Sequence, residues 1–240
     1  FGLKIRKEKQ KSLNSKGATM KNVKNIILAF AIGIMPFQIA YAESVDSQLV
    51  NVAGNCNLER IKKLVEFGAN INAKGSWDNT TALIRASSCG TLEVVQYLVD
   101  NGADVNATNM YNETALMNAI SNERLNVAQY LLSKGADINA KNSDNENALR
   151  NALGANKWQM VEFLIENGID INNKGKNGET FLMRVVTRYD SNINQVKYLL
   201  SKDADINAKN NKGENVFMKA LGDGKLEMAE FLKDNGAEVK

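Results

Sequence analysis

The segment that decides the fold is Asn101-Gly102-Ala103-Asp104-Val105-Asn106-Ala107, because it recurs along the whole chain. Close variants stand at 67–73, 134–140, 167–173, 202–208 and 235–239, and the residues at their second position are spaced by 34, 33, 33, 35 and 33. A second phrase, Thr114-Ala115-Leu116, keeps the same step at 81–83, 147–149, 180–182 and 215–217. Self-similarity at this period predicts a solenoid built from one repeated supersecondary unit.

Each unit reads as helix, turn, helix and extended loop. Thr or Asn precedes each first helix and is expected to cap it through a side-chain oxygen, with Ser47 in that role in the first unit. The second helix has apolar residues at helical spacing, and the glycine after it fits a left-handed cap. The residue expected to turn each loop is of a type that takes positive φ readily, namely Asn79, Asn112, Asn145, Gly178 and Gly213. One unit cannot bury both faces of its helices, so stability must come from stacking.

These phrases resemble the ankyrin repeat family over about residues 44–240. The resemblance implies an all-α repeat solenoid, an ankyrin-type stack of helix-turn-helix units with extended loops. Its six units fall near 44–77, 78–111, 112–144, 145–177, 178–212 and 213–240. The chain departs from the T-P-L-H-x-A signature of the family, because alanine commonly replaces the proline and the histidine position holds Ile84, Met117, Arg150, Met183 and Met218. The hydrogen bonding of that histidine must therefore be absent or replaced.

The segment 20–42 has the pattern of a secretory signal peptide. A short basic region leads into an apolar run at 26–37, and Ala40-Tyr41-Ala42 offers small residues at the two places that signal peptidase reads. We expect cleavage after Ala42 and a mature repeat domain at 43–240. An uncleaved membrane anchor is the alternative, disfavoured because the run is short and contains Pro36. The expected location is therefore across the inner membrane, in the periplasm or outside the cell.

Residues 1–19 have no leading methionine and fit no fold pattern. Codons for Lys16-Gly17-Ala18 can contain a purine-rich bacterial ribosome-binding sequence just before Met20. We therefore interpret 1–19 as a leader that is not normally translated, with Met20 as the start of a bacterial gene.

Composition excludes several function classes. The chain of 240 residues has no histidine, which excludes Ser-His-Asp and Cys-His catalysis and His-ligated zinc. The net charge of +3 comes from the front end, because residues 43–240 hold 22 basic and 26 acidic residues. A repeat domain with this slight excess of acidic residues lacks the positive charge typical of nucleic-acid-binding proteins. No phosphate loop, metal cluster or nucleophile–base pair is recognisable, so we expect neither a cofactor nor a metal, and no enzyme.

The two cysteines, Cys56 and Cys89, fall near the inter-helix turns of units one and two. Outside the inner membrane a disulfide is chemically permitted. Equivalent points on adjacent units are, however, often farther apart than the roughly 7 Å between α-carbons that a bridge allows. The sequence leaves the bridge open.

The family resemblance places the usual partner surface on the loop tips and the concave ends of the first helices. On this chain that surface comprises Trp77, Asp78, Arg85, Met110, Tyr111, Asn118, Ser143, Asp144, Lys176 and Asn177. Large apolar groups stand out at its first two tips, and such residues are enriched in binding hot spots. The alternative is that Trp77 folds back over Met110 and only covers a neighbour.

Three residue series repeat in register. We expect the asparagine series to hydrogen-bond stacked loops rather than to bind a ligand, and the aromatic series to lie in the core. The glutamate series either benefits from nearby helix N-termini or forms an acidic stripe for a basic partner. A parallel series four residues after each cap could neutralise that stripe, namely Arg85, Asn118, Asn151, Arg184 and Lys219. The series are Asn72, Asn106, Asn139, Asn172 and Asn207; Tyr97, Tyr130, Phe163, Tyr198 and Phe231; and Glu113, Glu146, Glu179 and Glu214.

The sequence therefore predicts a non-catalytic protein-interaction module, exported and monomeric, that binds a protein partner of unknown identity. After signal cleavage we expect no membrane association and no nucleic-acid partner. A chaperone-like or structural companion of a cell-envelope enzyme is the alternative.

Overall fold

The computed structural model describes residues 43–153 and 157–239, and this part of the chain folds into six consecutive helix pairs. The first helices are α2 (Val45–Ala53), α4 (Ala82–Cys89), α6 (Ala115–Ser121), α8 (Ala148–Ala152), α10 (Phe181–Thr187) and α12 (Val216–Gly222). The second helices are α3 (Leu58–Glu66), α5 (Leu92–Asp100), α7 (Leu125–Ser133), α9 (Trp158–Glu166), α11 (Ile193–Ser201) and α13 (Leu226–Asp234). A single 3₁₀ turn, η1 (Lys176–Gly178), lies in the loop before α10.

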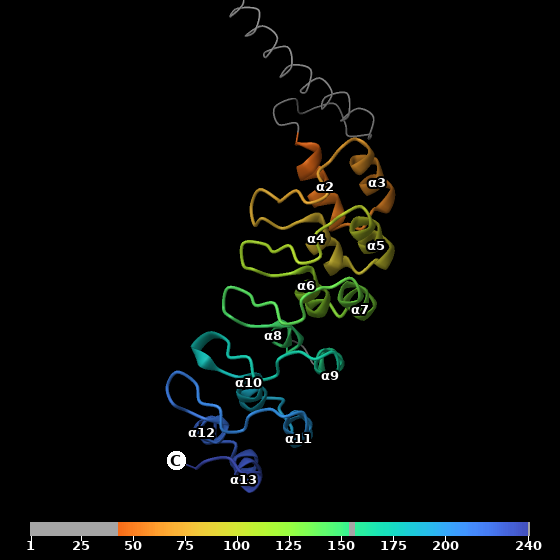
Figure 1. Ribbon diagram of the computed structural model, residues 1–240. Coiled ribbons are helices and arrows are strands. Elements are labelled where there is room, and N and C mark those ends of the chain that lie inside the picture. The colour runs from red at the N-terminus through yellow and green to blue at the C-terminus, as the bar shows by residue number, and fades with distance from the viewer. Residues whose placement is uncertain (1–42, 154–156, 240) are drawn as a thin grey trace, which may run out of the picture.

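The pairs stack in chain order into an elongated solenoid (Figure 1). The connecting loops all project from the same side, and the first helices lie between these loops and the second helices. This arrangement confirms the expected all-α repeat solenoid. The proposed leader 1–19 and signal peptide 20–42 lie outside the described residues. Within the described ranges, no helix is both long enough and apolar enough to cross a membrane.

Side-chain caps start the first helices. The hydroxyl oxygen of Thr81 accepts a hydrogen bond from the Ile84 amide at 3.3 Å, and Thr114, Thr180 and Asn215 cap their helices in the same way. Asn147 caps α8 through the Leu149 amide, two residues on. The expected cap of the first unit is wrong: Ser44, not Ser47, precedes α2 and accepts from the Ser47 amide at 3.1 Å. The helix α2 thus begins three residues earlier than its counterparts in the other units.

Left-handed residues end the second helices, as the repeated glycine predicts. Gly68, Gly102, Gly135, Gly168 and Gly236 have φ between 85° and 96°. Asp203 takes the same place in unit five with φ of 63°. An L-residue with a β-carbon is strained in this region, by about 1 kcal/mol.

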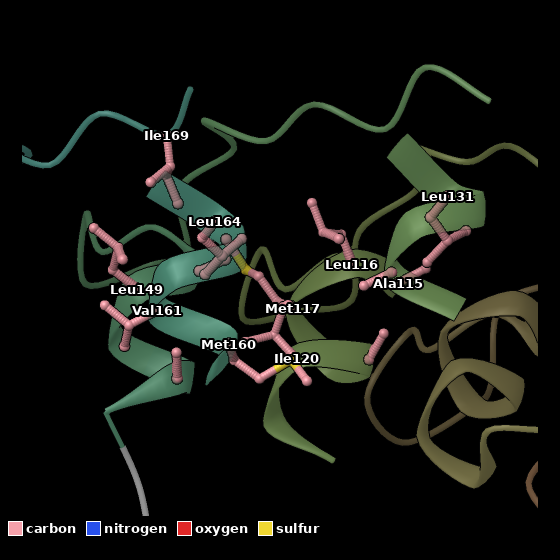
Figure 2. Close-up of a cluster of buried hydrophobic side chains, with 14 of the residues drawn as sticks. Ala115, Leu116, Met117, Ile120, Leu131, Leu149, Met160, Val161, Leu164 and Ile169 are labelled. Atoms are coloured by element: carbon pink, nitrogen blue, oxygen red, sulfur yellow. The ribbon is translucent and has the colours of Figure 1, made fainter. Parts of the chain in front are cut away.

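The core is a column of leucines, one from each second helix. Leu64, Leu98, Leu131, Leu164, Leu199 and Leu232 are each 0% exposed. Met117 and Met183, at the position where the family usually has histidine, are buried among apolar neighbours, and Met117 belongs to the same cluster as Met160 and Leu164 (Figure 2). At these two positions, apolar packing therefore replaces the missing histidine hydrogen bonds.

The aromatic series lies at the edge of this core rather than inside it. Tyr97, Tyr130, Phe163, Tyr198 and Phe231 are all half-buried against the cluster of buried residues. The prediction that they are core residues is wrong, because these rings are on the second helices, whose outer faces have no further layer above them.

The asparagine series joins each unit to the next. The Asn106 Nδ2 donates to the Gly135 carbonyl at 3.0 Å, and its Oδ1 accepts from the Asp137 amide at 2.8 Å. Asn72, Asn172 and Asn207 make the same pair of bonds one unit onward, and Asn139 accepts the bond from Asp170. The expected bonding between stacked loops is confirmed.

We predict that Asn106→Ala lowers the free energy of unfolding by about 1–3 kcal/mol, because two inter-unit hydrogen bonds are lost. The matched control is Asn122→Ala, whose side chain bonds only the Asn118 carbonyl within its own helix end. Urea unfolding followed by circular dichroism measures both variants. Equal losses in the two variants would contradict a stacking role for Asn106.

We also predict that units five and six exchange their amide hydrogens first, and that Asp203→Gly raises their protection. Relief of the left-handed strain should add up to about 1 kcal/mol of stability. The reciprocal control is Gly168→Asp, which has open space for a β-carbon and φ of 85°, and should lose a similar amount. Native-state hydrogen exchange checks this, and uniform protection across the six units would argue against it.

The structure joins Cys56 and Cys89 as a disulfide, with 6.3 Å between their α-carbons. Cys56 has φ of 50° in the turn between α2 and α3, where unit two has Gly90, and Cys89 ends α4. The two turns are therefore close enough for the bridge that the sequence left open.

We predict that peptide mapping without reductant recovers Cys56 and Cys89 in one linked peptide. The bridge closes a loop with a sequence separation of 33. The entropy of a loop of this size corresponds to about 3–4 kcal/mol, which the double variant Cys56→Ser, Cys89→Ser should lose. Reductant should destabilise the parent chain but not that variant; recovery of two separate peptides would disprove the bridge.

Candidate protein-binding surface

Five loops form what we call fingers, one between each helix pair and the next. They are finger one (74–80), finger two (108–113), finger three (141–146), finger four (174–179) and finger five (209–214). Finger one contains one more residue than the others. In Figure 1 they project side by side along the stack.

A single asparagine side chain organises finger two. The Asn109 Oδ1 accepts from the amides of Tyr111 and Glu113, both at 2.9 Å, while its Nδ2 donates to the Glu113 carboxylate at 3.0 Å. Asn142 and Asn210 accept the corresponding hydrogen bonds from backbone amides in fingers three and five. These asparagines are not among the residues predicted from the sequence, although they recur two places after the Val/Ile-Asn-Ala segment.

Backbone hydrogen bonds tie the finger tips to one another. The Met110 amide donates to the Asp78 carbonyl at 2.8 Å, and the Ser143 amide donates to the Tyr111 carbonyl at 2.8 Å. The Asn211 amide donates to the Asn177 carbonyl at 2.9 Å. Between fingers three and four, Lys176 Nζ lies 3.2 Å from the Asp144 carboxylate. The structure thus brings the expected tip residues together in one continuous row.

The row begins with an exposed apolar patch, defined as Trp77, Met110 and Tyr111. Trp77 is 94% exposed, and Met110 and Tyr111 are 52% and 54% exposed. The alternative that Trp77 folds back over Met110 is wrong, because a covering side chain would itself lose most of its exposure. Three large apolar groups on neighbouring, hydrogen-bonded fingers are a typical contact site.

Arg85 and Asn118 are the two residues expected on the first helices, and they differ in how free their side chains are to contact a partner. The Arg85 guanidinium lies 3.6 Å from the Asp78 carboxylate and borders the patch. Burial would raise the pKa of Asp78, but hydrogen bonds from Thr80 and the Arg85 charge outweigh it, so this pKa lies below its ordinary value. Asn118 bonds Ser88 at 3.2 Å and the Thr114 carbonyl at 3.2 Å, so its side chain serves the stack.

Two members of the glutamate series, Glu146 and Glu179, are paired with bases. Buried Glu146 pairs with Arg184 of the next unit and lies 3.2 Å from Arg150. Glu179 lies 2.9 Å from Lys219, and this hydrogen bond raises the pKa of Lys219. Glu113 and Glu214 instead accept hydrogen bonds from Asn109 and Asn210.

This pairing also explains the glycine in finger four. A β-carbon at Gly175, where fingers two, three and five have asparagine, would meet the Glu146 Cγ at 2.7 Å. The buried ion pair therefore occupies the space that a side chain would need. Glu146 and Glu179 therefore serve the stack, because their charges are paired within it.

Two further features were not found from the sequence. Tyr189, in the insertion between α10 and α11, is 93% exposed on the side away from the fingers. Trp158 packs edge-to-face against Tyr198 with 5.8 Å between ring centroids. Among the described residues, no group of three or more Cys, Asp or Glu side chains is placed to hold a metal ion.

Comparison with known proteins identifies ankyrin repeats along most of the described chain. A family model described as ankyrin repeats (3 copies) matches residues 49–142 and 149–240, and a second, ankyrin repeats (many copies), matches 123–165. An ankyrin repeat protein of Acanthamoeba polyphaga mimivirus is 50% identical over 48 residues, which are 20% of this chain and 34% of that relative. The match thus spans about a third of the length of the curated relative.

Among solved structures, the chain resembles one chain of a complex from Bdellovibrio bacteriovorus. That structure contains the predatory endopeptidase Bd0816 in complex with immunity protein Bd3460. The TM-score is 0.66 at 26% identity, and the match covers 78% of this chain and 96% of the other. With the helix pairs, the left-handed caps and the family models in agreement, the chain belongs to the ankyrin repeat family.

Proposed function

We propose that this chain is an exported binding module that holds a partner protein on its finger tips and adjoining first helices. Ankyrin repeats are generally non-catalytic modules for protein–protein interaction. The observation that carries the proposal is the exposed patch of Trp77, Met110 and Tyr111.

The fingers suit this role because they are already ordered before a partner binds. Asn109 fixes the backbone of finger two, and main-chain hydrogen bonds join finger two to fingers one and three. Ordering of loops on binding costs free energy, so a surface with fixed loops keeps more of its contact energy. The apolar patch supplies an anchor, and Arg85 with Asp78 supplies a polar border.

The comparison structure supports a second candidate, a companion of a cell-envelope enzyme. That structure contains an endopeptidase in complex with an immunity protein, and this chain matches nearly the whole of one of its chains. On this reading the partner is a peptidase whose activity changes when this chain is bound. The signal-like segment at 20–42 supports an encounter beyond the inner membrane.

The test is affinity capture from the cell envelope with the parent chain and the double variant Trp77→Ala, Tyr111→Ala. Removal of two exposed aromatic anchors should abolish capture of the partner while the far-UV circular dichroism stays unchanged, because neither ring packs in the core.

The control for that test is Tyr189→Ala, which removes an equally exposed ring away from the fingers. It should capture the partner as the parent does. Undiminished capture by the double variant would remove the patch from the binding surface. If a peptidase is recovered, assay of its activity with and without this chain separates the two candidate functions.

A further inference from the structure

A shallow hollow lies on the second helices of units four and five, away from the finger tips. It has a volume of about 500 Å³ and is lined by Trp158, Glu162, Asn192, Asn194, Gln195 and Tyr198. A smaller hollow of about 160 Å³ adjoins it and shares Trp158 and Gln195. The larger one falls in the size range of small-molecule sites.

Two of these residues break the repeat pattern. Trp158 opens α9 where α3, α5, α7 and α13 open with leucine and α11 with isoleucine. Gln195 stands at the position of Val94, Val127, Met160 and Met228, which are 0%, 0%, 4% and 5% exposed. In unit one the position of Gln195 holds Arg60, so apolar residues fill it in four of the six units. Trp158 packs edge-to-face on Tyr198 of the next unit, a contact that the leucines and the isoleucine at its position in the other units cannot make.

The repeat spacing also changes at this place. Unit five contains two extra residues around Tyr189-Asp190-Ser191, which lead into α11. Asp190 holds the Arg188 guanidinium at 2.7 and 2.8 Å, and Arg188 in turn donates to the Leu153 carbonyl at 2.5 Å. The insertion thus forms a fixed wall of the smaller hollow.

The walls combine aromatic rings with polar groups that the protein does not use. Within the described part of the chain, the side chains of Glu162, Asn194 and Gln195 make no hydrogen bond, and Asn192 uses only its Oδ1, to cap α11 at 2.9 Å. The Tyr198 Oη is buried there without a hydrogen-bond partner. Burial of an unpaired hydroxyl costs free energy.

The charges around the hollow disfavour an anion. Arg188 is occupied by Asp190, Lys157 bonds the Ser121 carbonyl, and Lys202 lies over the Tyr198 ring with 5.6 Å to its centroid. Glu162 is the charged residue that lines the larger hollow, and its charge raises the pKa of Tyr198 further beyond the effect of burial. A phosphate or carboxylate would meet this glutamate directly.

From this combination we propose that the hollow binds an uncharged sugar ring of an oligosaccharide. A pyranose has one face of polarised C–H groups, which suits the negative face of the Trp158 indole, and a rim of hydroxyls. Amides from Asn192, Asn194 and Gln195 donate to and accept from those hydroxyls, and the Glu162 carboxylate accepts. This site is separate from the protein-binding patch.

The test uses nuclear magnetic resonance of the chain with ¹⁵N-labelled indoles, titrated with chitotriose and with maltotriose. The chain has two tryptophans, Trp77 at a finger tip and Trp158 in the hollow. We expect at least one of these saccharides to shift the Trp158 indole signal saturably at millimolar concentration. The Trp77 signal should stay in place and serves as the internal reference.

Two variants restore residues that the other units carry and should therefore still fold. Trp158→Leu and Gln195→Val should each weaken binding by about tenfold or more in calorimetry. Tyr198→Phe, which removes only the unpartnered hydroxyl, should weaken it less. Tyr130→Phe makes the same change in unit three and should leave affinity unchanged.

The proposal is overturned if neither saccharide shifts the Trp158 signal, or if both indoles shift together without saturation. It is also overturned if Trp158→Leu and Gln195→Val bind as the parent does. A saturable Trp158 shift with a tryptophan-containing peptide, but with no saccharide, would assign the hollow to a protein side chain instead.

Discussion

The stack depends on one side chain per unit that bonds the backbone of the next unit. The series comprises the asparagines at 72, 106, 139, 172 and 207. Each of them accepts a hydrogen bond from a backbone amide of the following unit, and in four of them the side-chain Nδ2 also donates to a backbone carbonyl of that unit. The amide side chain can do both at once, because its oxygen accepts while its nitrogen donates. With the leucine column behind it, this series fixes the distance between units and keeps their loops aligned.

The alignment of the loops determines which residues are neighbours on the surface. Fingers held in register expose their tips in a row, so residues about 33 apart in the chain become neighbours. Trp77 and Tyr111 come together in this way, across the hydrogen bond from Met110 to Asp78. The same alignment also brings together groups that stay inside the stack. Buried Glu146 forms ion pairs with Arg150 and with Arg184 of the next unit, so its charge is not available to a partner.

In a repeat protein, residues that differ from those at the equivalent positions of the other units point to local structural or functional requirements. When most units fill a position with one kind of residue, a different residue there needs its own physical reason. Gly175 has one, because Glu146 occupies the space of a side chain. Asp203 is tolerated in a left-handed cap at a cost in stability. Trp158 and Gln195 depart from the apolar residues at their positions in most other units, and both line the hollow for which we propose sugar binding.

The sequence by itself determined the period, the helix pairs, the left-handed caps and the asparagine series, because each depends on local backbone preference repeated in register. It also located the finger tips. Only the tertiary structure decided that Trp77 stands free, that Cys56 and Cys89 approach to 6.3 Å, and that the aromatic series lies at the edge of the core. Those properties depend on how neighbouring units rotate and cover one another, which no single repeat encodes.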